Sequence, residues 1–304
     1  MQHPNRNAYI AIIIGVLSVS FSAILVKLSA AEAGVIAFYR LFFTVLIMSP
    51  YFFLFYRKEV KKLKRRDWVF SIIAGIFLAF HFILWFESLN YTSVASSTVL
   101  VTLQPLFAFV GSYFFFNERI TMRAAVAAVI AIGGSIIISW GDFQISGMAL
   151  YGDVLALIAC ALVTAYLLFG QDVRKRLSIV TYTFILYSIS TAVLFFYVLI
   201  KRESFGPLPM EEWIYFILLA MVPTLFGHTL FNWALRWIST TVISMAILFE
   251  PIGATILAYL LLGEKVFATQ VMGGSIVLLG LAVFILDGKK VWSTAFIRKV
   301  LRAK

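Results

Sequence analysis

The chain has 304 residues, of which 62% are hydrophobic and 13% are charged, and its formal net charge is +11 at pH 7. Ordinary soluble domains are about 45–50% apolar and about 25% charged, so this composition excludes a water-soluble fold. A single cysteine, Cys160, excludes an intramolecular disulfide framework and cysteine-rich metal clusters. The positive charge does not indicate nucleic-acid binding, because the basic residues lie in short gaps between apolar runs and form no single basic face.

Ten apolar segments are long enough to cross a bilayer, whose hydrocarbon core of ~30 Å requires about 20 helical residues. In chain order these segments are 8–28, 35–56, 68–89, 93–116, 121–140, 150–170, 179–200, 213–233, 240–262 and 266–286. Their connections are short, so neighbouring helices are expected to run antiparallel and to pack as hairpins. The sequence therefore predicts an all-α polytopic membrane protein with ten transmembrane helices.

Lysine and arginine concentrate on one side of the predicted spans. The basic residues on the side of the N-terminus are Arg6, Arg57, Lys58, Lys61, Lys62, Lys64, Arg65, Arg66, Arg119, Arg123, Arg174, Lys175, Arg176, Arg236, Lys289, Lys290, Arg298, Lys299, Arg302 and Lys304. Connections on the other side hold only Lys201, Arg202 and Lys265, with Lys27 near a helix end. Because basic loops remain in the cytoplasm, we expect a multi-pass protein of the inner (plasma) membrane with both termini cytoplasmic. The basic loop after the second span is expected to contact lipid headgroups.

Two stretches of the chain resemble each other. Residues 89–119 align without a gap with residues 235–265. The alignment pairs Pro105 with Pro251, Gln104 with Glu250, Tyr113 with Tyr259, Glu118 with Glu264 and Arg119 with Lys265, and it pairs His81 with His228 when one residue is skipped. Apolar residues often match by chance, but agreement at proline, acidic and basic positions indicates a duplication.

Each half holds five predicted spans, an odd number, so the second copy is expected to enter the membrane upside down. The predicted organisation is a first repeat at 1–145, a second repeat at 146–290 and a basic cytoplasmic tail at 291–304. Inverted repeats suit alternating access, because the two halves can exchange shapes around one site midway through the bilayer. The alternative is that the duplication records ancestry alone.

These repeated residues resemble the EamA-type branch of the drug/metabolite transporter superfamily. The matching motifs are Pro105 followed by residues 117–119 (NER), and Glu250 and Pro251 followed by residues 263–265 (GEK). The resemblance covers essentially the whole chain and implies a five-plus-five inverted-repeat carrier with a central cavity. Such carriers usually export amino acids, related metabolites or drugs. Gln104 departs from the acid-proline form of the motif, so a role for an acid at this position can reside only at Glu250.

Glu250 is the strongest functional candidate among the polar residues of the spans. An ionisable side chain at bilayer depth costs at least ~2.5–3.5 kcal/mol, so those that occur usually face a cavity or a partner. Glu250 lies near the middle of the ninth predicted span, where it is a candidate proton acceptor for coupled transport. The alternative is a structural acid that hydrogen-bonds a neighbouring helix.

Two predicted helices carry polar residues on one face. Thr224, His228 and Asn232 have the spacing i, i+4, i+8, and His81 and Trp85 repeat this pattern in the third span. We expect both faces to point into a cavity, although a lone histidine is more often a satisfied core residue. Small and hydroxyl residues also stripe two helices, where close packing is the favoured interpretation; they are Gly15, Ser18, Ser22, Cys160, Thr164 and Gln171.

Arg40 is expected either to bind a substrate carboxylate or to pair with Glu87 at a similar depth, and the ion pair is favoured. Trp85 and Tyr166 are candidates for stacking on a substrate. The predicted substrate-binding residues are therefore His81, Trp85, Gln104, Tyr166, His228, Asn232, Glu250, Tyr39 and Arg40. Pro105 and Pro251 each remove a backbone donor and are predicted to kink their helices.

The predicted function is secondary transport. The protein is expected to export a small organic metabolite, such as an amino acid, by alternating access around a cavity at the middle of the bilayer. The sequence contains no phosphate-binding loop of the G-x-x-x-x-G-K-[ST] type, so an ion or substrate gradient is expected to supply the energy. A passive channel and a lipid flippase remain alternatives. A membrane-embedded transferase is disfavoured, because its Mg²⁺ needs clustered acids and the aspartates here are scattered. No cofactor, metal or nucleic acid is expected, and the partners are the substrate and membrane lipids.

Overall fold

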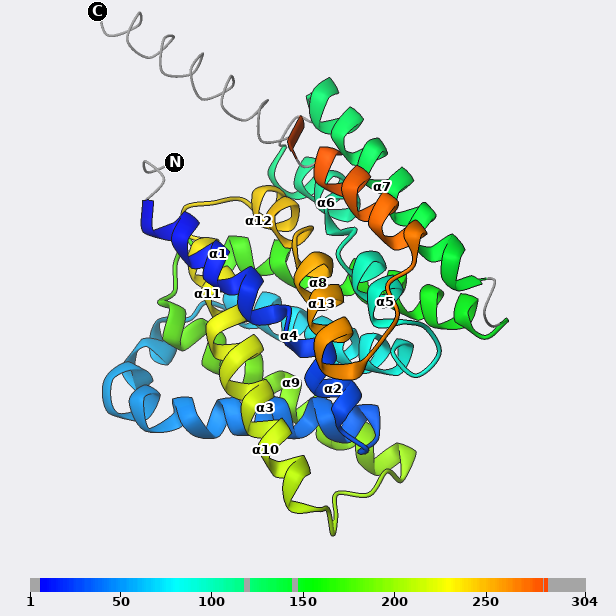
Figure 1. The fold of residues 1–304 in the computed structure, drawn as a ribbon. Helices are drawn as coiled ribbons and strands as arrows, with labels where there is room; N and C mark the ends of the chain where they lie inside the picture. The colour runs from blue at the N-terminus through cyan, green and yellow to red at the C-terminus, as the bar shows by residue number, and fades with distance from the viewer. Residues whose placement is uncertain (1–5, 118–120, 144–146, 281, 284–304) are drawn as a thin grey trace, which may run out of the picture.

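A computed structural model describes residues 6–117, 121–143, 147–280 and 282–283, and in these ranges every regular element is a helix. Figure 1 shows the helices as one bundle. The first half contains α1 (Arg6–Val19), α2 (Ser22–Leu28), α3 (Ala33–Tyr51), η1 (Phe52–Tyr56), η2 (Arg57–Lys62), α4 (Arg65–Ser88), α5 (Val94–Val101), α6 (Gln104–Phe116) and α7 (Met122–Phe143). The second half contains α8 (Ala149–Val173), α9 (Ile179–Lys201), α10 (Met210–Leu219), η3 (Ala220–His228), α11 (Thr229–Ala234), α12 (Thr240–Ile247), α13 (Glu250–Leu257) and η4 (Ala258–Leu262).

The prediction of an all-α polytopic membrane protein is confirmed. Eight helical stretches of the described chain are long and apolar enough to cross a membrane, and the predicted fifth and tenth spans contain the shorter apolar helices Ala125–Gly134 and Ala268–Gly280. Large apolar side chains such as Leu17, Phe114 and Ile200 are 61%, 76% and 80% exposed, which suits a surface that contacts lipid. Glu118 and Arg119 of the repeated motif and the basic tail lie outside the described residues.

Several predicted spans are interrupted helices. The first span breaks between α1 and α2, where the Ser20 hydroxyl donates to the carbonyls of Val16 at 3.0 Å and Glu250 at 3.3 Å. The fourth span breaks between α5 and α6, and the ninth breaks between α12 and α13. Gln104 and Glu250 are the first residues of α6 and α13, so both prolines stand in a first turn, where a missing N–H costs least. The sequence predicted kinks at Pro105 and Pro251, and in the structure a two-residue turn interrupts each helix just before Gln104 and Glu250.

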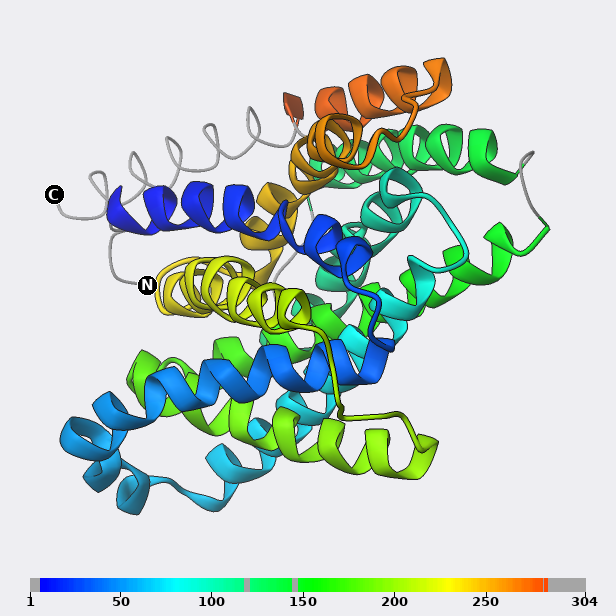
Figure 2. The same cartoon turned by 60° about the horizontal axis from the view of Figure 1, so that its bottom comes forward.

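Long helices from the two halves pack side by side. Helices α4 and α8 contact each other extensively, as do α3 and α9 (Figures 1 and 2). Gly75 permits the close approach of α4 to α9, because a Cβ there would lie 2.7 Å from Ile189, and the Ser190 hydroxyl donates to the Gly75 carbonyl at 2.8 Å. Ser178 caps α9 by accepting from the Thr181 N–H at 3.2 Å.

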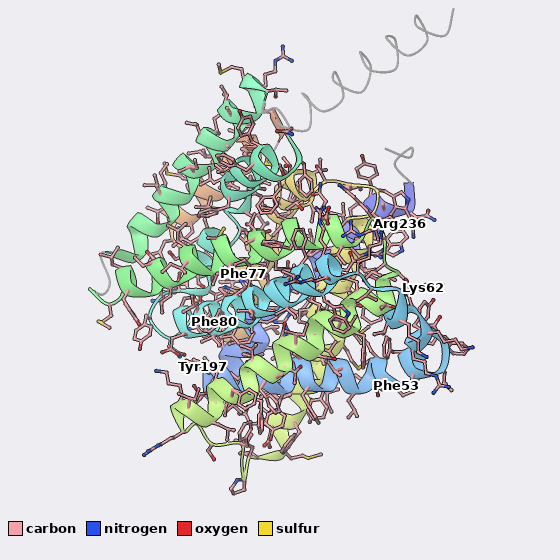
Figure 3. All side chains as sticks on the ribbon, turned by 180° about the vertical axis from the view of Figure 1, so that it is seen from behind. Phe53, Lys62, Phe77, Phe80, Tyr197 and Arg236 are labelled. Atoms are coloured by element: carbon pink, nitrogen blue, oxygen red, sulfur yellow. The ribbon has the colours of Figure 1, made fainter. Side chains whose placement is uncertain are left out.

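The bundle has two chemically different ends. We call the end that holds residues 57–66 and 174–178 the basic end, and the end that holds residues 29–34 and 202–212 the opposite end. Figure 3 shows Lys62 and Arg236 towards the basic end, whereas Tyr197 lies towards the opposite end.

Candidate substrate site

A small cavity lies at the centre of the bundle between the two halves. Its volume is about 20 Å³, which is room for about one water molecule. Polar side chains on its wall come from α2, α4, α6, α8, η3 and α13, and they are Ser22, His81, Trp85, Gln104, Tyr166, His228 and Glu250. The structure therefore brings together most of the predicted substrate-binding residues, whereas Tyr39, Arg40 and Asn232 lie outside the wall.

The two histidines face each other across this cavity, with ring centroids 6.3 Å apart. His81 Nδ1 lies 3.0 Å from the Ala159 carbonyl oxygen, which can only accept a hydrogen bond. A neutral His81 therefore carries its proton on Nδ1 and leaves Nε2 as an acceptor. His228 Nδ1 lies 3.1 Å from the Tyr166 hydroxyl, and the ring of His81 stacks on Trp85 at 5.8 Å.

Asn232 supports this group from behind. Its Nδ2 donates to the His228 carbonyl at 2.8 Å and lies 3.5 Å from the Tyr166 hydroxyl. Both Asn232 and Tyr166 are 0% exposed. Asn232 is therefore placed to orient Tyr166 and His228, which themselves reach the cavity.

Two cavity side chains are buried without a complete set of hydrogen bonds. Among the described residues, Trp85 Nε1 and Gln104 Oε1 have no hydrogen-bond partner. Buried polar groups are nearly always satisfied in folded proteins, and one left unsatisfied costs about 1–3 kcal/mol. A bound molecule with both hydrogen-bond donors and acceptors would supply the missing partners of these two atoms. Glu250 adds a carboxyl group in the first turn of α13.

Arg40 adds a fully buried cation next to the cavity. Its Nε donates to Thr224 Oγ1 and one terminal nitrogen donates to Ser22 Oγ, each at 2.8 Å. The guanidinium also lies 4.2 Å from the centre of the Phe82 ring, a cation–π contact. The other terminal nitrogen has no hydrogen-bond partner among the described residues. Because Ser22 belongs to the wall, this hydrogen bond joins Arg40 to the edge of the cavity.

The prediction that Arg40 forms an ion pair with Glu87 is wrong. Glu87 accepts instead from Tyr91 at 3.3 Å and from Asn90 at 3.4 Å, beyond the end of α4. Arg40 turns inward because hydroxyl acceptors and an aromatic face surround it there. The separate partners of the two side chains leave no contact between them.

Tyr39 points away from the cavity. Its hydroxyl donates to the Phe205 carbonyl at 2.9 Å, and its ring packs against Trp213 and Phe216 with centroids 4.9 and 5.0 Å away. These contacts join α3 to α10 and to the connection before it. We therefore assign Tyr39 to packing at the opposite end.

The two prolines at the helix breaks each leave one carbonyl without its usual intrahelical donor. Pro105 has no N–H to donate to the carbonyl four residues earlier, at Val101, and Pro251 has none for the carbonyl at Ile247. Val101 and Ile247 both line the cavity. Sequence reasoning missed these residues and Ser22, because an apolar side chain or a small-residue stripe gives no sign of a site. Within the described residues, no three His, Cys, Asp or Glu side chains form a group that could hold a metal ion.

Comparison with known proteins identifies the family. The sequence model of the EamA-like transporter family matches residues 6–140 and again residues 150–286. The chain belongs to the EamA-like transporter family. This confirms the resemblance drawn from the repeated motifs and shows that the protein is a membrane transporter.

Relatives of this EamA-like chain include proteins named only as transporters. It is 24% identical to an uncharacterized transporter, YxxF, of Bacillus subtilis over 74% of this chain and 72% of the relative. An S-adenosylmethionine uptake transporter of Rickettsia bellii is 30% identical over 34% of each chain. A solved crystal structure superposes with a TM-score of 0.72 over 94% of this chain and 98% of its own, at 16% identity, and shows that the fold is shared.

Proposed function

We propose that this EamA-like transporter exports a small organic metabolite, such as an amino acid, by alternating access around the central cavity. The observation that supports the proposal is one small cavity that residues of both halves enclose, with unpartnered polar atoms of Trp85 and Gln104 on its wall and the buried Arg40 beside it. Donors are available at Arg40 and Trp85, and acceptors at Gln104 and Glu250. A molecule that carries both an anionic and a cationic group completes these pairs.

The assignment of roles follows from charge. The free terminal nitrogen of Arg40 takes the substrate carboxylate, because a guanidinium forms strong charge-assisted hydrogen bonds with carboxylates. Glu250 takes the substrate ammonium group or, in the empty site, a proton. Trp85 and His81 form an aromatic wall for the substrate side chain, and Tyr166 and His228 close the other side. Glu250 is also the proposed coupling residue, since a carboxyl group exposed alternately to two compartments can carry one proton per cycle.

The proposed cycle depends on opposed repeats at 1–145 and 146–290. Two features support them: the family model matches both halves, and equivalent breaks before Pro105 and Pro251 place Gln104 and Glu250 at one cavity. The concentration of lysine and arginine at the basic end supports a cytoplasmic location for that end and for both termini, in the inner membrane.

A lipid flippase is a second candidate, supported by a separate groove of about 350 Å³ between α13, η4 and the helix Ala268–Gly280. The groove is almost entirely apolar and includes Ile256, Leu260 and Val271, as an acyl chain requires. Movement of a fluorescent phospholipid between leaflets in proteoliposomes, without uptake of amino acids, would favour this candidate.

The proposal is tested by uptake into liposomes that contain the purified protein, with amino acids screened with and without a proton gradient. We expect saturable uptake of at least one amino acid, lost in Arg40→Gln and insensitive to the gradient in Glu250→Gln. Glu211→Gln is the matched control, because this acid is exposed at the start of α10, away from the cavity. Uptake that survives Arg40→Gln unchanged would remove the assignment of the carboxylate site.

A further inference from the structure

The central cavity is too small for any organic substrate, so transport requires the helices around it to separate. Its volume of about 20 Å³ holds about one water molecule. In a cycle of alternating access the separation must occur at one end of the bundle at a time. The contacts that close each end are therefore the parts of the structure that decide which side of the membrane the cavity faces.

At the basic end, a carboxylate that follows α3 binds the start of α9. Glu59 lies in η2 and accepts from the Ser178 N–H at 2.8 Å, as well as from the hydroxyls of Ser178 and Thr181. Ser178 is the N-cap of α9. A negative charge at this position is favourable, because the N-terminus of a helix carries a partial positive charge.

At the opposite end, a carboxylate that follows α9 binds the start of α3. Glu203 comes two residues after the end of α9, and its carboxylate lies against the first turn of α3, near Gly34 and Val35, with Oε2 lacking a hydrogen-bond partner among the described residues. Gly34 allows the close approach, because a Cβ there would collide with the Glu203 carboxylate and lie 2.8 Å from the Tyr197 ring. Helices α3 and α9 thus close each other's N-termini at the two ends of the bundle.

A second pair of contacts repeats the same reciprocity. At the basic end Asp67, in the first turn of α4, pairs with Arg176 at 2.6 Å, just beyond α8. At the opposite end Glu212, in the first turn of α10, accepts from the Ala30 N–H at 2.8 Å and from the Ser29 hydroxyl, just beyond α2. Asp67 and Glu212 each precede a tryptophan in the sequence, as expected of equivalent positions in two repeats.

From these contacts we infer that Glu59 and Glu203 are the two gate residues of the transport cycle: each holds one end of the α3–α9 pair closed, and each releases it when that end opens. This inference rests on the proposed alternating access. Asp67 and Glu212 strengthen the respective gates through α4 and α10. The structure has both gates closed, which agrees with its collapsed cavity.

The two gates differ in strength because their charges differ. At the basic end Asp172 and Asp67 share ion pairs with Arg66 and Arg176, at 2.6 to 3.1 Å. At the opposite end neither Glu203 nor Glu212 has an ion-pair partner among the described residues.

Around Glu203 the charges are mostly negative. Burial and the charges of Glu32 and Glu87 raise the pKa of Glu203 to about 7, although the Val35 N–H and Lys201 act in the other direction, and Tyr197 also faces the carboxylate. The opposite end is therefore the weaker gate and opens more readily in the absence of substrate.

Cysteine accessibility in membrane vesicles tests this inference without knowledge of the substrate. The reporter is Val163→Cys on the cavity wall, in a Cys160→Ala background that removes the only native thiol. A membrane-impermeant maleimide is applied to each face in turn. Exposed reporters Lys62→Cys and Arg202→Cys show which face carries the basic end and which the opposite end.

Removal of a helix-capping side chain changes an equilibrium by roughly three- to thirtyfold, so labelling rates should change by this factor. Glu203→Ala should accelerate labelling from the opposite end alone, and Glu59→Ala from the basic end alone. Glu203→Gln, which keeps a polar side chain of the same size against the first turn of α3, should not accelerate labelling. Glu211→Ala is the control and should match the parent.

A second measurement covers the case in which Glu59→Ala does not fold. A disulfide between Glu59→Cys and Ser178→Cys should abolish labelling from the basic end and preserve it from the opposite end. Equal acceleration from both faces in either alanine variant, or no acceleration in both, overturns the assignment of gates. Failure of amino-acid uptake alongside the expected labelling pattern would refute the proposed substrate and leave the gates standing.

Discussion

Replacement of Arg40 by methionine is expected to separate stability from transport. Arg40 is 0% exposed and forms two hydrogen bonds, to Ser22 and Thr224, and one cation–π contact with Phe82. Hydrogen bonds from a charged group contribute about 1.5–3 kcal/mol each, so their loss costs ~3–6 kcal/mol. Burying a cation costs several kcal/mol, which methionine avoids at similar volume. The two terms nearly cancel, and the folded protein should survive the substitution.

The effect on transport should be much larger. If the free nitrogen of Arg40 binds the substrate carboxylate, its loss removes at least one charge-assisted hydrogen bond, or about 1.5–3 kcal/mol, and the KM for uptake should rise roughly ten- to a hundredfold. Uptake into proteoliposomes gives KM, and thermal unfolding in detergent gives stability. Arg40→Lys, which keeps the charge but not the planar fork, should show a smaller rise.

Arg174→Met is the matched control for this experiment. Arg174 is also buried, at 1% exposed, but it donates to the carbonyls of Asn232, at 2.9 Å, and Leu177 near the basic end. Arg174→Met should change the thermal stability of the protein without raising the KM for uptake. An unchanged KM in Arg40→Met would refute the assignment of Arg40 as the substrate's counter-charge, and a failure of Arg40→Met to fold while Arg174→Met folds would show a structural role instead.

Labelling from the opposite end should depend on pH through Glu203, whose pKa is about 7 when that end is closed. Opening exposes this carboxylate and lowers its pKa, so the closed state binds the proton more tightly. The ratio of Val163→Cys labelling to labelling of the exposed reporter Arg202→Cys, which removes the pH dependence of the thiolate, should rise between about pH 5 and 7 and level off above, and a flat ratio would contradict this. Gly34→Ala should displace Glu203 and raise opposite-end labelling as Glu203→Ala does, whereas parental rates would argue against this contact. Gly134→Ala should lower the free energy of unfolding by ~1–3 kcal/mol, because its Cβ would lie 2.6 Å from the Gly273 carbonyl, and Gly133→Ala, with no neighbour within 4 Å, should unfold like the parent in a thermal assay.

Features that depend on local sequence were predicted well. Apolar length located the eight described helical stretches that are long enough to cross a membrane, and helical spacing placed His81 and Trp85 on one buried face of α4 and His228 on a buried face of η3. The repeated prolines marked the correct positions in the fourth and ninth spans. A break could not be distinguished from a kink there, because the packing of the flanking half-helices decides between them.

Features that depend on tertiary contacts were missed. Glu59 and Ser178 are separated by 119 positions in the sequence, and the approach of Glu203 to α3 likewise joins distant parts of the chain. Glu59 stands in a run of basic residues. The role of this run in membrane topology explains its charge, so nothing in the sequence indicates a distant partner for Glu59. Arg40 was assigned to Glu87 on depth alone, since the rotation of α3 about its axis is set by neighbours that the sequence does not reveal.

The interruptions before Pro105 and Pro251 have a consequence for how this architecture diversifies. Because proline has no N–H, the carbonyls of Val101 and Ile247 lack their usual intrahelical donor whatever side chains those positions carry, so this source of acceptors belongs to the backbone of two segments that line the cavity. Descendants of such a scaffold can exchange every cavity side chain and still offer oxygen atoms to a cationic group. Substrate specificity can then change through side-chain substitutions, while the capacity to bind a polar substrate within the membrane is retained by the backbone.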